Sequence, residues 1–155
     1  MAARAASGCV FCAIAAGAAP ASLIVDDEAV LAFMDLRPWR RGHLLVTPRA
    51  HGQRLADLPA ATVTAMFALA TELAGAVRAS GLPCDDVNLL VNDGPAAGQT
   101  VAHAHVHVVP RVGGDLWRVA TLLVGRVLPP AARARLDADA TAITAALVRR
   151  RGGAG

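Results

Sequence analysis

The chain contains no tyrosine and no lysine, and aromatic residues make up only 3% of its 155 residues. We therefore expect a core built mainly from Ala, Val and Leu. Without lysine, all 15 basic side chains are arginines, and they stand against 12 acidic residues for a net charge of +3. This excess is small and scattered, apart from Arg149, Arg150 and Arg151, and it argues against a nucleic-acid-binding surface.

Long apolar runs are also missing, because no stretch reaches the roughly 18 apolar residues that a membrane span requires. Residues 1–8 lack the apolar segment of a secretory signal, so a cytoplasmic location is the expectation. The length suits one hydrophobic core. Residues 1–155 are therefore predicted to form a single domain that binds neither membrane nor nucleic acid.

Cysteine is scarce, with three residues in the whole chain. Cys9 and Cys12 are separated by two residues, a spacing more typical of metal or redox chemistry than of a structural disulfide. Cys84 has no neighbour of its kind in the sequence and is expected to be inert.

Hydrophobic periodicity, with glycine and proline at the breaks, predicts an α+β protein with a mainly antiparallel sheet. Pro110 is expected to close the last strand, and Pro129 and Pro130 to start the last helix. In chain order the predicted elements are a short helix at 9–16, strands at 23–26, 29–34 and 43–47, a main helix at 59–80, strands at 87–91 and 101–109, and a helix from 129 to about 148.

Three histidines alternate with small apolar residues in His103-Ala104-His105-Val106-His107. On a strand, residues two apart face the same side, so this spacing predicts a row of three imidazoles on one face. The intervening residues point the other way and can be buried. A neutral imidazole is a good nucleophile towards phosphorus at neutral pH, and its phosphoramidate is labile enough for water to complete the reaction.

This row, followed by two valines, resembles the signature of the histidine-triad (HIT) family. Matching blocks lie in the same order around it: Phe33-Met34-Asp35-Leu36, Gly42-His43 through His51, Asn92-Asp93-Gly94, and Gly98-Gln99-Thr100 leading into His103. The resemblance covers residues 9–111 as the domain core, with a helical extension over about 129–149. It implies a HIT-like α+β fold with a five-stranded sheet, a homodimer and a purine nucleotide substrate such as an AMP derivative.

The resemblance also implies roles for individual residues. His105 would be the nucleophile that forms a nucleotidyl intermediate, and His107 would hydrogen-bond the α-phosphate. His43 matches a histidine close to the triad. Gln99 and Thr100 match residues at the leaving group, and Asn92 and Asp35 match residues at the ribose-phosphate. Apolar residues at the base pocket would include Phe11, Phe33 and Leu36. From local sequence alone, Asp35 can equally be a turn residue, Asn92, Gln99 and Thr100 can brace their loop, and the apolar residues can be core.

Cys9 and Cys12 pair with two distant histidines as a possible metal set. A Cys-x2-Cys pair with two histidines is typical of a tetrahedral structural zinc site. The zinc-binding branch of the family implies His51 and His103 as the other ligands, a closed shell without an open catalytic position. A metal-free thiol pair and a redox pair are the alternatives.

The predicted activity is hydrolysis of nucleoside phosphoramidates or dinucleoside polyphosphates at the α-phosphate. Three alternatives stay open: a nucleotidyltransferase or phosphorylase using the same His105 intermediate, a purine-nucleotide-binding interaction module with incidental activity, and a metalloenzyme with the histidine row as its metal site. No sequence feature assigns a role to Trp39, Arg111, Trp117 or the arginines at 149–151.

Overall fold

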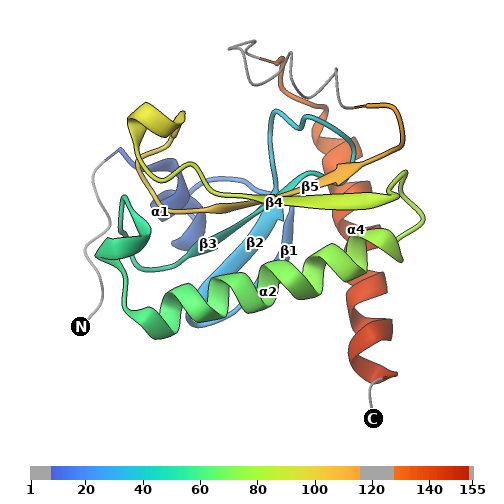
Figure 1. Ribbon diagram of the computed structural model, residues 1–155, viewed down its shortest axis with the longest axis horizontal. Helices are drawn as coiled ribbons and strands as arrows, with labels where there is room; N and C mark the ends of the chain where they lie inside the picture. Colours follow the sequence, from blue (N-terminus) through green and yellow to red (C-terminus); the bar gives the residue numbers. More distant parts are fainter. Residues whose placement is uncertain (1–7, 116–127, 154–155) are drawn as a thin grey trace.

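The predicted strands assemble into one five-stranded sheet in the computed structural model, which describes residues 8–115 and 128–153 (Figure 1). The strands are β1 (Leu23–Asp26), β2 (Val30–Met34), β3 (Leu44–Pro48), β4 (Asp86–Leu90) and β5 (Val106–Arg111). Their order is β1-β2-β3-β5-β4, and every neighbouring pair is antiparallel. The predicted α+β class and antiparallel sheet are confirmed, with β5, the strand that carries His107, in the interior of the sheet.

Three α-helices are described: α1 (Val10–Ala15), α2 (Ala60–Arg78) and α4 (Arg133–Gly152), with short 3-10 turns at Leu55–Asp57 and Pro95–Ala97. The main helix is where the sequence predicts it. The C-terminal helix begins and ends about four residues later than predicted, because Pro129 and Pro130 lie in an irregular segment before the N-cap at Ala132. Its predicted apolar side is buried, including Leu136, Ile143 and Leu147. Trp117 lies outside the described residues.

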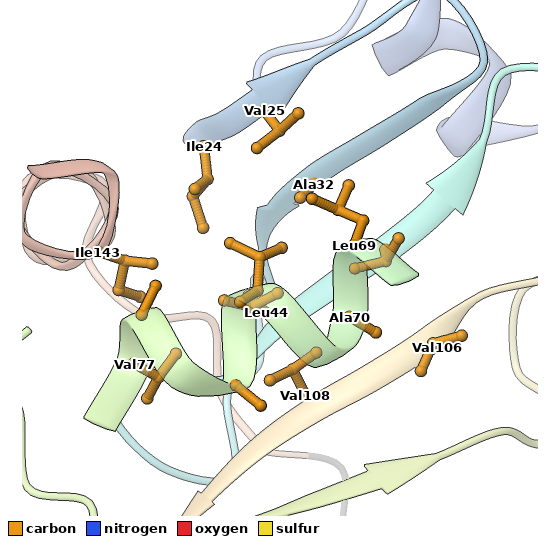
Figure 2. Close-up of a cluster of buried hydrophobic side chains, with 14 of the residues drawn as sticks. Ile24, Val25, Ala32, Leu44, Leu69, Ala70, Val77, Val106, Val108 and Ile143 are labelled. Carbon is orange, nitrogen blue, oxygen red and sulfur yellow. The ribbon is translucent and has the colours of Figure 1, made fainter. Parts of the chain in front are cut away.

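The two faces of the sheet have different partners because the strand side chains alternate. Leu44 and Val46 face the larger core, which α2 and α4 complete (Figure 2). Leu45, between them, joins a smaller cluster with Phe11 of α1 and with Leu31 and Phe33 of β2. The large core thus supports the sheet from one side, and the face with α1 is left for the polar residues described below.

Helix α2 is long and apolar enough to cross a membrane by length and composition alone. In the structure it is a core helix instead, because Met66, Ala70, Leu73 and Val77 are fully or nearly fully buried against the sheet and α4. A core helix of a globular domain passes the same test of length and hydropathy.

The strand predicted at 101–109 is wrong at both ends. Strand β5 begins only at Val106, so His103 and His105 precede it. The backbone N–H of His103 bonds to the Val101 carbonyl, and that of Ala104 bonds to the Gly52 carbonyl, so neither pairs with a strand. The predicted alternation still holds in burial, since Ala104, Val106 and Val108 lie in the large core.

Pro110 does not end β5 as predicted. The strand continues to Arg111, and Pro110 lies opposite Val87 of β4. On its other side, β3 pairs with β5 only up to Val108. Because Pro110 lies beyond the end of that pairing, the missing N–H breaks no bond to β3.

Candidate active site and metal centre

Two thiols and two imidazoles converge where α1 meets the segment before β5. Cys9 lies next to the first turn of α1 and Cys12 lies within it. The Cys9 Sγ is 3.4 Å and the Cys12 Sγ is 3.6 Å from the His103 Nδ1, and the Cys12 Sγ is 3.3 Å from the His51 Nδ1. The four ligand atoms all lie within 4.8 Å of one another. The structure therefore brings together all four residues predicted as metal ligands.

The geometry of this cluster fits a tetrahedral zinc ion. Zn–S bonds of about 2.3 Å and Zn–N bonds of about 2.0–2.1 Å give a sulfur-to-nitrogen edge of about 3.5–3.6 Å in a tetrahedron. The observed separations are close to that edge. His103 is also in the required form: its Nε2 is 2.9 Å from the Pro48 carbonyl, to which it must donate, so Nδ1 keeps its lone pair for a metal.

In His105, a hydrogen bond to the backbone holds the Nδ1 nitrogen. Its Nδ1 is 2.7 Å from the carbonyl oxygen of His103, and because a carbonyl oxygen only accepts, Nδ1 carries the proton. The neutral ring therefore has its lone pair on Nε2, the nitrogen at the tip of the side chain. Burial, partly opposed by this hydrogen bond and by the Asp35 carboxylate, lowers the pKa of His105. The ring is therefore neutral at pH 7, with the Nε2 lone pair uncommitted to this hydrogen bond.

His43 and His107 form a hydrogen-bonded pair beside it. The backbone N–H of Trp39 donates to the Nδ1 of His43 at 3.1 Å, so the proton of the neutral His43 ring is on Nε2. That nitrogen is 3.0 Å from the Nδ1 of His107, which accepts. The proton of His107 is consequently on Nε2, as a donor. The centroids of the His105 and His107 rings are 4.7 Å apart, so the ring with a lone pair on Nε2 lies next to the ring with a proton on Nε2.

Burial keeps this pair uncharged. His43 is completely buried and His107 is 9% exposed. Burial and the neighbouring His105 lower the pKa of His43 to about 3. The pKa of His107 is also lowered to about 3, by burial and by the neighbouring His43 and His105. The Asp35 carboxylate lies 3.5 Å from the His43 Nε2. Since His43 is neutral at pH 7, this contact is not a salt bridge at that pH.

Asp35, His43 and His107 also lie close enough together to be considered as a metal site. The Trp39 N–H argues against one, because it occupies the lone pair of the His43 Nδ1 and leaves the proton on the nitrogen that would have to bind the metal. The hydrogen bonding therefore disfavours a metal ion held by Asp35, His43 and His107.

Two of the predicted nucleotide-binding residues, Phe11 and Phe33, belong to the small apolar cluster between α1 and β2. The rings of Phe11 and Phe33 are packed edge to face with centroids 5.3 Å apart, and Phe11 also contacts the ring of His105. Leu36, two residues beyond the end of β2, is 46% exposed. Asp35 accepts a hydrogen bond from the Arg37 backbone through Oδ1, so it is a turn residue as well as a neighbour of His43.

Asn92, Gln99 and Thr100 are less closely tied to the imidazoles. The Asn92 amide donates to the Gly98 carbonyl at 3.4 Å, and the Gln99 amide donates to the Gln53 carbonyl at 2.7 Å, so both brace their loop. Thr100 is exposed. Within the described ranges, no hydrogen bond joins these three side chains to a histidine, and their catalytic and binding roles remain predictions.

No sequence feature assigns a role to Trp39, which the structure places against His43 and His107. Its indole lies nearly parallel to the His107 ring, at an interplanar angle of 11° and a centroid distance of 5.8 Å, and it also contacts the His43 ring. Gly42 helps the loop to reach this position: it has φ +81°, and a Cβ there would lie 3.1 Å from Pro110. The one available signal in the sequence was that Trp39 lies four residues before His43. That spacing does not reveal the stacking on His107.

Comparison with known proteins identifies the family. Residues 16–114, more than half of the chain, match the HIT domain model. An uncharacterised HIT-like protein of Mycobacterium tuberculosis is 47% identical over 112 residues, which are 72% of this chain and 77% of that protein. The adenylylsulfatase HINT3 of Arabidopsis thaliana is 40% identical over 111 residues (70% of this chain, 55% of that protein). The adenosine 5'-monophosphoramidase HNT1 of Saccharomyces cerevisiae is 33% identical over 105 residues (68% and 63%).

Among solved structures, a zinc-bound histidine triad family protein from Mycobacterium smegmatis is similar, with a TM-score of 0.80 and 41% sequence identity. The match covers 94% of this chain and 97% of that one. Family model, sequence relatives and fold agree with the histidine row and its flanking blocks. The chain therefore belongs to the HIT family.

Proposed function

We propose that this protein hydrolyses nucleoside 5'-phosphoramidates through a nucleotidyl intermediate on the Nε2 of His105. The observation that carries the proposal is the hydrogen bond from the His105 Nδ1 to the His103 carbonyl, which leaves the Nε2 lone pair available beside the Nε2–H of His107. Relatives named as an adenosine 5'-monophosphoramidase and an adenylylsulfatase support a nucleotide substrate.

The proposed reaction has two displacement steps. In the first, the His105 Nε2 bonds to the α-phosphorus, the phosphorus–nitrogen bond to the amine breaks, and the amine leaves with a proton taken from solvent. The His103 carbonyl, already bonded to Nδ1–H, stabilises the positive charge that develops on the ring. In the second, the oxygen of water bonds to phosphorus, the ring recovers its lone pair, and a nucleoside monophosphate and one proton are released.

The neighbouring residues would bind the nucleotide. The Nε2–H of His107 would hydrogen-bond the α-phosphate, Gln99 and Thr100 would lie at the leaving group, and Asn92 at the ribose-phosphate. The Asp35 carboxylate would accept from the ribose hydroxyls, and the apolar surface of Phe11, Phe33 and Leu36 would hold a purine. Amine, sulfate and nucleotide leaving groups all fit this first step, so adenylyl sulfate and dinucleoside polyphosphates are the substrates to compare.

The cysteine–histidine cluster is part of the proposal as a structural zinc site. Cys9, Cys12, His51 and His103 would hold the ion in a closed shell, which fixes α1 to the segment that carries His105. Since the four ligands come from this chain alone, the ion would stabilise the domain and leave no position for substrate. We expect a cytoplasmic homodimer. Its interface would include β4, at the edge of the sheet, where Leu89 is 38% exposed, and α2, where Phe67 is 37% exposed.

Trapping the intermediate tests the function. Enzyme quenched in denaturant at neutral to alkaline pH during turnover of adenosine phosphoramidate should carry an AMP adduct on the peptide with residues 79–111. Fragmentation should place the adduct on His105, and the His105→Ala variant should show none. An adduct on another residue, or multiple turnovers by His105→Ala, would contradict the mechanism. Product analysis with inorganic phosphate or a sugar phosphate added separates a hydrolase from a transferase or phosphorylase, and release of no AMP by the wild type would favour the binding module.

A further inference from the structure

Trp39, in the loop between β2 and β3, contacts both histidines of the His43–His107 pair. Trp39 contributes two contacts of different kinds: its backbone N–H fixes the proton of His43 on Nε2, and its indole lies over the His107 ring. Because His43 in turn donates to His107, the position of Trp39 decides which nitrogen of His107 presents a proton to a substrate.

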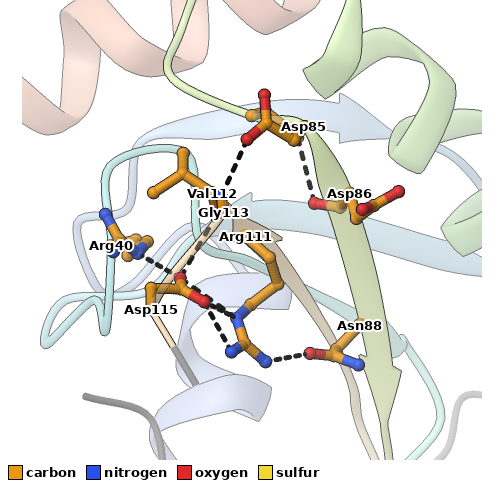
Figure 3. A network of polar contacts seen from close by, with 9 residues as sticks. Arg40, Asp85, Asp86, Asn88, Arg111, Val112, Gly113 and Asp115 are labelled. Carbon is orange, nitrogen blue, oxygen red and sulfur yellow. Dashed lines mark hydrogen bonds and ion pairs between the residues drawn. The ribbon is translucent and has the colours of Figure 1, made fainter. Parts of the chain in front are cut away.

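The next residue, Arg40, is anchored outside the site. Its Nε donates to the Oδ2 of Asp115 at 2.6 Å, and the side chain of Asp115 is only 5% exposed. The same carboxylate accepts from the Nε and Nη2 of Arg111, at 2.9 and 2.6 Å, and from the Val112 backbone (Figure 3). One buried carboxylate therefore joins the Trp39 loop to Arg111, the last residue of β5.

This connection is specific to the active site because β5 also carries His107. The Asp115 carboxylate ties the loop that holds Trp39 to the strand that holds the ring beneath it. Arg41, one residue further on, offers a contrast: its Nη2 donates to the buried Asp139 at 2.5 Å, which ties the same loop to α4. Helix α4 carries none of the proposed active-site residues.

At neutral pH the Asp115 carboxylate is charged and faces two arginines, which favours a permanent link between the Trp39 loop and β5. The Arg111 guanidinium, assisted by the Val112 N–H and Arg40 and opposed by burial, lowers the pKa of Asp115 to about 2. Arg40 and Arg111 face this carboxylate from two elements, and charge-assisted hydrogen bonds of this length are among the stronger polar contacts in proteins.

We propose that Asp115 is a positioning residue: by holding Arg40 against the end of β5, it keeps Trp39 on His43 and His107 and so fixes the proton of His107 on Nε2. Asp115 itself touches no reacting atom. The effect on turnover rests on the proposed function, whereas the effect on the imidazole protons does not.

The test compares the two anchors of the loop in the full-length, zinc-loaded protein. Asp115→Asn and Arg40→Ala break the first anchor, Arg40→Lys keeps its charge, and Asp139→Asn weakens the second anchor as the matched control. All variants carry Trp117→Phe, so that Trp39 is the only tryptophan. The readouts are the imidazole ¹⁵N resonances of the five histidines, the Trp39 emission maximum, and kcat and KM with adenosine phosphoramidate.

Breaking the first anchor should mix the Nδ1-H and Nε2-H forms of His43 and His107 and move the Trp39 emission to longer wavelength. The kcat should fall by about tenfold to a hundredfold, the range seen when hydrogen bonds that orient a reactive group are lost, with KM within about threefold. Arg40→Lys should recover part of kcat. Asp139→Asn should lower thermal stability and leave imidazole spectra, emission and kcat unchanged.

Unchanged imidazole spectra in folded Asp115→Asn and Arg40→Ala would overturn the proposal, as would equal effects from Asp139→Asn. If Asp115→Asn does not fold, Arg40→Ala and Arg40→Lys decide the question, since they leave the Arg111–Asp115 contact in place. A wild-type protein without turnover on any nucleotide would refute the proposed function, while the spectra and the emission would still decide the role of Asp115.

Discussion

His103 and His105 are two residues apart in one segment, yet they present opposite nitrogens. His103 donates from Nε2 to the Pro48 carbonyl and keeps the Nδ1 lone pair, which faces the thiols of Cys9 and Cys12. His105 donates from Nδ1 to the His103 carbonyl and keeps the Nε2 lone pair. The same side chain is thus a candidate metal ligand in one place and a candidate nucleophile in the other.

In both histidines, the nitrogen that donates to a backbone carbonyl carries the proton, so the position of that carbonyl decides which nitrogen keeps a lone pair. A lone pair on Nδ1 lies close to the main chain and suits a compact cluster with α1. A lone pair on Nε2 lies at the tip of the ring and can reach a phosphorus atom. The carbonyl of His103 also connects the two regions, since it belongs to the proposed metal ligand and holds the proposed nucleophile.

The largest expected effect is on the nucleophile region. His105→Ala removes the Nε2 lone pair, and kcat with adenosine phosphoramidate should fall by at least about a thousandfold, as for other enzymes that lose a covalent nucleophile. Zinc content and thermal stability should stay close to those of the wild type, because the ligand cluster is untouched. Loss of bound zinc in this variant, measured by atomic emission, would mean that the two regions are not separable.

The next effect is on the metal region. Cys12→Ser should remove stoichiometric zinc and lower the free energy of unfolding by about 3 kcal/mol or more, since a metal that binds only the folded chain stabilises it. Turnover should fall as well, because His103 loses its orientation and its carbonyl holds His105. Cys84→Ser, a matched control outside the cluster, should change neither zinc content nor stability. Full zinc loading of Cys12→Ser would disprove the ligand assignment.

A smaller effect concerns stability in acid. An unfolded chain binds protons on His43 and His107 near pH 6.5, whereas burial holds both pKa values at about 3 in the folded chain. The unfolded state therefore gains more protons, and the free energy of unfolding should fall by up to about 1.4 kcal/mol per pH unit for each histidine between about pH 6 and pH 4.

Urea unfolding at several pH values measures this slope. His43→Gln and His107→Asn should each reduce it, while acid release of the metal affects wild type and variants alike. Equal slopes in all three proteins would show that the pair is not the source of the acid sensitivity.

The smallest effect lies between the two regions, on β3. The hydroxyl of Thr47, one residue before Pro48, is fully buried and has no hydrogen-bond partner in the part of the chain that is described. Thr47→Val keeps the shape and removes an unsatisfied polar group, so stability to urea should rise by about 1 kcal/mol. Thr71→Val, at an exposed position where the hydroxyl bonds the Phe67 carbonyl, is the control and should change it by less than half as much. A destabilised Thr47→Val protein would reveal a partner for that hydroxyl.

Local pattern predicted most elements because their causes are local. The alternation around His105 predicted which residues face the core, and the periodicity of 59–80 predicted α2 to within two residues. It failed at residues 101–105, where strand-like alternation is present but the backbone bonds of His103 and Ala104 go to a turn and to Gly52. Burial follows from the alternation of side chains, whereas a strand also needs a partner, which this segment lacks.

The sequence by itself determined the family, the α+β class and the set of chemically capable side chains, because these depend on residue types and their spacing. Only the tertiary structure decided which histidine nitrogen each backbone group occupies, that Trp39 lies on His107, and that Asp115 links the Trp39 loop to β5. The reason is physical: a proton's place on an imidazole depends on hydrogen-bond partners that are distant in the sequence or determined by the local backbone path, and no residue pattern specifies those directions.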